Sequence, residues 1–330
     1  MASEVVVNGT DVIHPCYEFH HLYYVLSKTH SLQCVLLNIF LSLLSIIIIC
    51  GNLLIIISVL YFKQLHTPTN YLILSLAVAD LLVGVSGFPL SIEFSVTYCV
   101  YQKELLCQIR NIIDITLSTA SILHLCCISI DRYYAVCKPL MYRSIITDRV
   151  VGVMISMSWS LSGLVAVRFV VTRINYAKCG EKCYNDILIA SVLGLICSFY
   201  LPVIIMLCIY VKIFLVAQKQ ARSIENANHQ SRMLRATVSK MERKATKTLS
   251  IVVGFFLICW SPFFLYSCIR LGNRTLIPIA FFEGLTWLAL TNSMFNPFIY
   301  AFFYSWFQSA FKMIITGKIF QGDFSHIKLH

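Results

Sequence analysis

Four acidic residues lie within or at the end of apolar stretches of this sequence, where an ionised side chain is costly and therefore marks a candidate functional site. Asp80, Asp114 and Glu283 are each flanked by apolar residues, and Asp131 opens an Asp-Arg-Tyr triplet. A buried carboxylate that lacks a cation invites a protonated amine as its partner. Asp114 is accordingly the first candidate for binding an amine, and a structural hydrogen-bonding acid is the alternative.

The surroundings of Asp114 sharpen this expectation. We place Cys107 at the outer membrane surface. A helix rises about 1.5 Å per residue, so Asp114 would lie about 10 Å below that surface and about 27 Å from Arg132. One helix would then carry an anion near its outer end and an arginine at its inner end. We expect no Lys or Arg in the middle of any span to neutralise Asp114, which favours a cationic ligand.

Glu283 is the candidate for a second anionic contact. It precedes Trp287 by one helical turn, and helix geometry predicts roughly 7 to 12 Å between its carboxylate and that of Asp114, about the length of a four- or five-carbon diamine. The alternatives are a rim glutamate in water, a glutamate paired with an arginine, or use of Glu93 in its place. The candidate arginines are Arg110, Arg270 and Arg274.

The elements that position these acids follow from composition. The 330 residues are 58% hydrophobic and only 12% charged, with a mean hydropathy of +0.77, which is too apolar for a soluble globule. The apolar segments are long, continuous and rich in Leu and Ile, unlike the short alternating strands of a β-barrel. We predict an all-α bundle of seven membrane-spanning helices and no nucleic-acid-binding domain, despite the net charge of +11. The predicted spans are 34–62, 71–98, 108–137, 150–171, 187–216, 245–269 and 278–304.

The distribution of basic residues predicts the orientation. The connections after spans one, three and five and the C-terminal tail, taken with the span ends that adjoin them, hold 17 of the 26 Lys and Arg residues, and cytoplasmic segments retain positive charge. We therefore expect an extracellular N-terminal tail over 1–33, a receptor domain over 34–304, and an amphipathic helix with a cytoplasmic tail over 305–330. No cleavable signal peptide is apparent, and Asn8 lies in a glycosylation sequon on the outer side.

Motifs in all seven spans carry a resemblance to a known family. They are Gly51-Asn52, Asp80, Cys107, Asp131-Arg132-Tyr133, Trp159, Pro202, Tyr210, Cys259-Trp260-Ser261-Pro262-Phe263-Phe264 and Asn296-Pro297-Phe298-Ile299-Tyr300. Together they resemble a rhodopsin-like (class A) G-protein-coupled receptor along essentially the whole chain. The stretch from Asn292 to Tyr304 and the segment Gly317-Lys318-Ile319-Phe320-Gln321 resemble the trace amine-associated receptors.

The resemblance implies a plasma-membrane receptor for amines that activates a stimulatory G protein, raises cyclic AMP and serves olfaction. The ligand-binding residues that it implies, with the second acid added, are Asp114, Glu283, Ser118, Ser198, Trp260, Phe263, Phe264 and Trp287. The aromatic members can hold an ammonium by cation–π attraction, or can simply pack. Gly194 and Leu195 stand where catecholamine receptors place serines, which disfavours a catechol ligand.

The resemblance also implies an activation switch and two disulfides. The switch residues are Asp131, Arg132, Tyr133, Glu242, Pro202, Ile122, Phe256, Tyr210, Asn296, Pro297 and Tyr300. An ion pair between Arg132 and Glu242 would favour the closed state; membrane-boundary charges that extend toward water are the alternative. By resemblance, Cys107 pairs with Cys183 and Cys16 with Cys179.

A group of oxygen-bearing side chains fits the family's sodium site, since a hard cation prefers oxygen ligands. These are Asp80, Ser121, Asn292, Ser293 and Asn296; a dry hydrogen-bond network is the alternative. We expect no other cofactor and no catalysis, because no nucleophile constellation or metal-ligand spacing is present. The competing interpretations are a peptide or orphan receptor of the same class and a small-molecule transporter.

Overall fold

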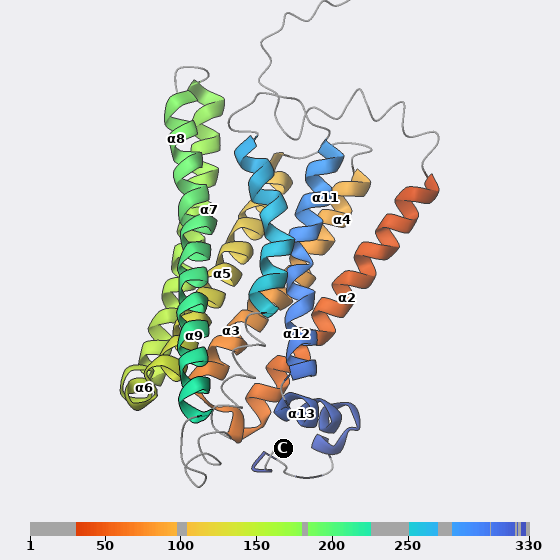
Figure 1. Ribbon diagram of the computed structural model, residues 1–330. Coiled ribbons are helices and arrows are strands. Elements are labelled where there is room, and N and C mark those ends of the chain that lie inside the picture. The colour runs from red at the N-terminus through yellow and green to blue at the C-terminus, as the bar shows by residue number, and fades with distance from the viewer. Residues whose placement is uncertain are drawn as a thin grey trace, which may run out of the picture.

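The computed structural model describes residues 31–97, 104–179, 184–225, 251–269, 279–303, 305–320, 322 and 325–327. Every regular element in these ranges is helical, and the long helices form one bundle (Figure 1). Six of the described helices are long and apolar enough to cross a bilayer: Val35–Tyr61, Pro68–Ile92, Gln108–Cys137, Asp148–Thr172, Ser191–Val216 and Ile251–Ile269. The predicted all-α fold is confirmed.

The elements correspond closely to the predicted spans. The bundle contains α2 (Ser31–Tyr61), α3 (Pro68–Leu82), α4 (Phe88–Thr97), α5 (Glu104–Cys137), α7 (Asp148–Cys179), α8 (Tyr184–Leu195), α9 (Leu201–Glu225), the helix Ile251–Ile269, α11 (Ile279–Leu290) and α12 (Asn292–Phe303). The short helices α6 (Pro139–Ile145) and α13 (Ser305–Ile315) lie at one end, which is the lower end in Figure 1. We call it the lower end and the opposite one the upper end.

Two spans contain a wide π-helical turn that hydropathy does not predict. Val83–Gly87 joins α3 to α4, and Ile196–Tyr200 joins α8 to α9. Pro89 and Pro202 follow these turns. A proline ring collides with the carbonyl four residues before it, and a π turn opens the helix at that point. Each span therefore remains one rod with a local widening.

The seventh span is divided at Thr291, and its lower half is fitted against α2. Pro297 lies inside α12 and, because it has no N–H group, cannot donate to the carbonyl of Ser293. The side-chain amide of Asn52 in α2 donates to that carbonyl at 3.2 Å. A β-carbon on Gly51 would lie 2.9 Å from two carbons of the Pro297 ring. Gly51 and Asn52 thus permit close approach and replace the hydrogen bond that the proline removes.

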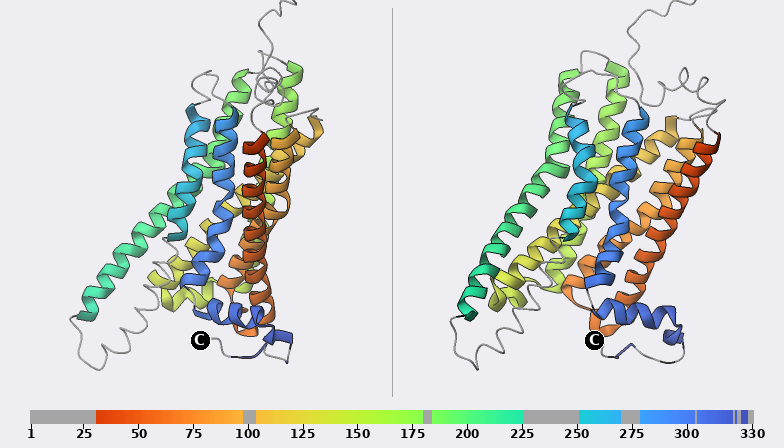
Figure 2. Two further views of the ribbon diagram at one scale, coloured as in Figure 1. Left: turned by 90° about the vertical axis from the view of Figure 1, so that its right-hand side faces the viewer. Right: turned by 45° about the vertical axis from the view of Figure 1, so that its right-hand side comes forward.

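The predicted amphipathic helix is α13, which lies across the lower end of the bundle (Figure 2). Its Phe307 and Ala310 are buried, and Ala310 belongs to a small apolar cluster with Phe62 and Leu65. Many large apolar side chains of the bundle are exposed, such as Leu164 on α7. This is the distribution expected of helices that face lipid.

Candidate functional site

An acid–arginine cluster joins α5 to α11 in the upper half of the bundle. Arg110 donates from Nη1 to Oε1 of Glu283 at 3.1 Å and from Nη2 to Oε2 at 2.6 Å. Both residues are 6% exposed. This is the two-pronged arginine–carboxylate geometry, which is among the strongest polar contacts in proteins. Of the alternatives for Glu283, the structure shows the pairing with Arg110.

Asp114 is the third member of the acid–arginine cluster, and its two oxygens differ. Oδ2 lies 3.4 Å from Nε of Arg110, one helical turn earlier on α5. Oδ1 is buried and has no hydrogen-bond partner among the described residues. A β-carbon on Gly87, in the π turn of the second span, would lie 3.6 Å from this oxygen. The carboxylate therefore points one poorly satisfied oxygen toward the second span.

We expected no Lys or Arg in the middle of any span to neutralise Asp114, and the conclusion that Asp114 lacks a basic neighbour is wrong, because Arg110 near the start of the same span lies 3.4 Å from it. Residues four apart on a helix face the same side, so the spacing of Arg110 and Asp114 carried the signal. The pairing of Arg110 with Glu283 could not be predicted from spacing in the sequence, because it depends on how α11 is placed beside α5. Arg110 is the site residue that our sequence reasoning treated only as an alternative partner.

The predicted aromatic residues fall into two groups, of which Trp260, Phe263 and Phe264 form one. The Trp260 ring lies 6.0 Å from the Phe263 ring and 5.8 Å from the Phe264 ring, between centroids. Phe264 stacks on Phe199 of the π turn at 3.8 Å. Trp287 instead packs against a separate apolar cluster that contains Leu117 and Leu290. The indole nitrogens of both tryptophans are buried without a partner among the described side chains.

The two serine candidates are bonded within their own helices. Ser118 donates to the carbonyl of Asp114 at 2.5 Å, and Ser198 donates to the carbonyl of Gly194 at 2.7 Å. Such back-bonding satisfies a hydroxyl without a ligand. Their positions on α5 and in the π turn are as predicted, and their role toward a ligand stays a prediction.

The predicted sodium residues do come together around Asp80. Ser293 donates to Oδ1 of Asp80 and Asn296 donates to Oδ2, each at 2.7 Å. Ser121 and Asn292 are also buried, and their oxygens have no partner within the described ranges. Asp80 is 0% exposed. The hydrogen bonds from Ser293 and Asn296 to Asp80 match the alternative of a dry hydrogen-bond network. The oxygens of Ser121 and Asn292 could in addition serve as ligands to a cation.

A buried histidine in α5 was not among the residues that sequence reasoning selected. His124 is 0% exposed and lies 2.7 Å from the Ser75 hydroxyl, which also accepts a 3.0 Å hydrogen bond from the indole of Trp159. The other ring nitrogen contacts the Ala120 carbonyl at 2.6 Å. The imidazole thus connects the second, third and fourth spans, and an ionisable residue inside an apolar segment was the available signal.

Arg132 at the lower end of α5 is held by its neighbours. Its Nε lies 2.8 Å from Oδ2 of Asp131, and its Nη2 contacts the same oxygen and Thr69. Tyr142 of α6 donates to Oδ1 of Asp131 at 2.8 Å. Burial raises the pKa of the Tyr142 hydroxyl, so it stays a donor at neutral pH. The proposed partner Glu242 lies outside the described residues.

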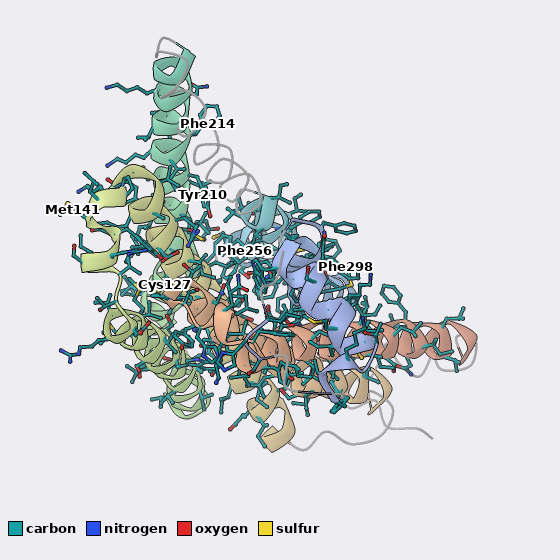
Figure 3. All side chains as sticks on the ribbon, turned by 90° about the horizontal axis from the view of Figure 1, so that it is seen from below. Cys127, Met141, Tyr210, Phe214, Phe256 and Phe298 are labelled. Carbon is teal, nitrogen blue, oxygen red and sulfur yellow. The ribbon has the colours of Figure 1, made fainter. Side chains whose placement is uncertain are left out.

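The remaining switch residues occupy the core between the two ends. Ile122, Phe256 and Pro202 are buried, and the first two share the main apolar cluster with Trp260. Tyr210 accepts a hydrogen bond from Ser129 at 3.3 Å. Seen from below, Phe256 lies between the helices, whereas Phe214 and Met141 lie at the edge (Figure 3). Tyr300 is buried in α12, and Tyr133 packs its ring on that of Tyr134.

The predicted disulfides and glycosylation site fall largely outside the described part of the chain. Cys16, Cys183 and Asn8 lie outside it. The backbones of Cys107 and Cys179 lie in α5 and α7, but their side chains are not described. These pairings stay predictions.

Comparisons with known proteins agree with this arrangement. The family described as 7 transmembrane receptor (rhodopsin family) matches residues 51–300. Trace amine-associated receptor 1 of Macaca mulatta is 46% identical over 306 residues, which cover 87% of this chain and 90% of that protein. The human receptor 1 is 44% identical over 294 residues, covering 84% and 87%, and mouse trace amine-associated receptor 4 is 43% identical over 298 residues, covering 85% of each.

The chain therefore belongs to the rhodopsin family of seven-transmembrane receptors and, within it, to the trace amine-associated receptors. It is a multi-pass membrane receptor and not an enzyme. The family acts through a small ligand and a G protein. The transporter interpretation is thereby excluded.

Proposed function

We propose that this receptor binds a small amine whose ammonium pairs with Asp114. The observation that carries the proposal is the buried Oδ1 of Asp114, which has no hydrogen-bond partner among the described residues. A buried carboxylate oxygen without a donor is costly, and an ammonium would compensate it. The names of the relatives, trace amine-associated receptors, support the same ligand class.

Asp114→Asn tests this proposal, because it removes the charge and keeps the shape. The response to a monoamine such as phenylethylamine should fall about a hundredfold or more, as expected when one partner of a buried charge pair is lost. Cyclic AMP is measured in transfected cells, with surface expression as the control. A phenylethylamine response that survives in Asp114→Asn would show that the ammonium does not pair with Asp114, and a wild type without a response to amines would favour the peptide or orphan receptor interpretation.

A second candidate gives Glu283 a second ammonium, so that diamines or polyamines are the preferred ligands. The supporting observation is that Glu283 is buried and contacts the same guanidinium as Asp114. A second ammonium would have to replace Arg110 at Glu283. Diamine potency should then fall selectively in Glu283→Gln, and monoamine potency should not change.

The signalling end of the receptor is the lower one in this proposal. We infer that the N terminus is extracellular and that a stimulatory G protein binds where Arg132 and α6 lie. The excess of basic residues in the connections at that end supports the orientation. Coupling to cyclic AMP is checked with the same assay, in cells that lack the stimulatory G protein as the control. Olfactory use and glycosylation at Asn8 stay predictions from the sequence.

We further propose that Asp80 binds an allosteric sodium ion with the oxygens of Ser121, Asn292, Ser293 and Asn296. The two unpaired oxygens at Ser121 and Asn292 support it. Sodium should lower agonist affinity in the wild type and have no effect in Asp80→Asn. Equal sodium sensitivity of both receptors would leave the dry hydrogen-bond network as the explanation.

A further inference from the structure

We infer that Arg110 is a built-in counter-cation that makes this receptor select ligands with one ammonium, and that Glu283 positions it. The inference rests on the proposed amine function of Asp114. Arg110 contacts both acids, with two hydrogen bonds to Glu283 and a longer 3.4 Å contact to Asp114. Its guanidinium thus occupies the place that a second ammonium of a diamine would take.

Counting charges shows why one ammonium suffices. The guanidinium is always protonated in proteins, so it offsets one of the two carboxylates. The acid–arginine cluster then has one uncompensated negative charge, and a monoamine completes it. A diamine would bring a second positive charge next to Arg110, and like charges that cannot reach water repel strongly.

The unequal contacts of Arg110 explain which acid is left for the ligand. Both oxygens of Glu283 are satisfied, whereas Oδ1 of Asp114 lacks a donor among the described residues. Arg110 and Asp114 lie one turn apart on α5, so the guanidinium could turn fully onto Asp114 if Glu283 did not hold it. Glu283 therefore keeps the amine-binding carboxylate available, although it does not touch the ligand itself.

If Glu283 positions Arg110, Glu283→Gln should weaken the binding of monoamines. If Glu283 instead bound a second ammonium, the same variant would weaken only the binding of diamines. Without its partner on α11, Arg110 would pair with Asp114 and compete with the ligand. Monoamine affinity should then fall by about tenfold or more, because a competing buried charge pair must be broken. Arg110→Gln should instead expose two uncompensated acids and raise the affinity of diamines relative to monoamines by about tenfold or more.

The test is competition binding on full-length receptor in membranes, with labelled phenylethylamine as the reference ligand. Pentylamine and cadaverine form one matched pair of competitors, and butylamine and putrescine form another. The variants are Arg110→Gln, Glu283→Gln and the double variant, with Arg168→Gln as a control that removes an exposed arginine from α7. Wild type and control should prefer the monoamine of each pair.

The double variant completes the test because it leaves the cluster with Asp114 alone. It should recover the monoamine affinity that Glu283→Gln loses, and it should lack the diamine preference of Arg110→Gln. If the single variants fail to reach the membrane, the double variant, which keeps the net charge of the acid–arginine cluster, is compared with the wild type and should match its affinity for phenylethylamine. The inference is overturned if Glu283→Gln spares phenylethylamine, if Arg110→Gln leaves the diamine ratio unchanged, or if the double variant does not bind phenylethylamine. Loss of binding in Asp114→Asn is a separate result that bears on the proposed function.

Discussion

The two ends of α5 each carry an arginine beside an aspartate, but the two arginines are held in different ways. At the upper end, Arg110 reaches across to Glu283 of α11 and only weakly contacts Asp114 of its own helix. At the lower end, Arg132 contacts the adjacent Asp131 and also Thr69. Asp131 is in turn bonded by Tyr142 of α6.

The difference shows how one helix can serve two purposes. The upper aspartate keeps an oxygen unsatisfied and so can respond to an incoming cation, whereas both oxygens of Asp131 are satisfied and restrain Arg132. A ligand can shift such a bundle only through different affinities for its two states. We therefore expect upper-end variants to alter ligand affinity and lower-end variants to alter the signalling equilibrium.

The largest separation of the two ends should come from comparing Arg110→Ala with Arg132→Ala. Arg132→Ala should abolish G-protein activation, a loss of about a hundredfold or more, while labelled amine still binds. Arg110→Ala should change ligand affinities and retain signalling. Radioligand binding and nucleotide exchange are measured on the same membranes. Loss of amine binding in Arg132→Ala at normal surface expression would break the distinction.

Gly51→Ala should have the next largest effect, on the stability of the packing between α2 and α12. Its β-carbon would lie 2.9 Å from the ring carbons of Pro297, and overpacking of this kind costs about 1 to 3 kcal/mol. The thermal midpoint of detergent-solubilised receptor should fall. Gly152→Ala is the matched control, because nothing lies within 4 Å of its β-carbon. Equal midpoints for both variants would contradict the close approach.

Asp131→Asn should raise ligand-independent signalling by several-fold, because Arg132 loses its charged partner. A hydrogen bond to a charged group contributes about 1.5 to 3 kcal/mol, and part of it is kept by the amide. Basal cyclic AMP is measured at matched surface expression. Amine affinity should change little, and a large fall in affinity without a basal rise would argue against a local restraint.

Tyr142→Phe should have the smallest effect and the same direction. It removes one 2.8 Å hydrogen bond to Asp131 and leaves the carboxylate charged. Basal signalling should rise less than in Asp131→Asn, and the double variant should resemble Asp131→Asn alone, since both changes act on the same carboxylate. Additive effects would show that Tyr142 acts through another contact.

Hydropathy predicted the spans because a stretch of about 20 apolar residues has few other stable solutions in a bilayer. It did not predict the π turns at Val83–Gly87 and Ile196–Tyr200. A proline signals that a helix must adjust, but neighbouring helices decide whether it kinks, breaks or widens. Hydropathy likewise did not predict the division of the last span at Thr291.

For the candidate site, the sequence likewise predicted the acidic residues but not all of their partners. Asp114, Asp80 and Asp131 were found because charges in apolar segments are rare, and Ser293 and Asn296 contact Asp80 as members of the predicted group of oxygen-bearing side chains. Arg110 was underestimated although its helical spacing from Asp114 was visible. His124 was missed, and its bond to Ser75 links segments that are distant in the sequence.

The sequence thus established which side chains share a helix and how they are spaced along it, because helical geometry is regular. It also identified the acids that need a partner, because a buried charge is costly. Which acid Arg110 pairs with was decided by packing, because Glu283 is 173 residues away and becomes a neighbour only when α11 lies beside α5. A charge in the membrane must find a partner, but the sequence states only the requirement, and the folded bundle supplies the distances that choose among the candidates.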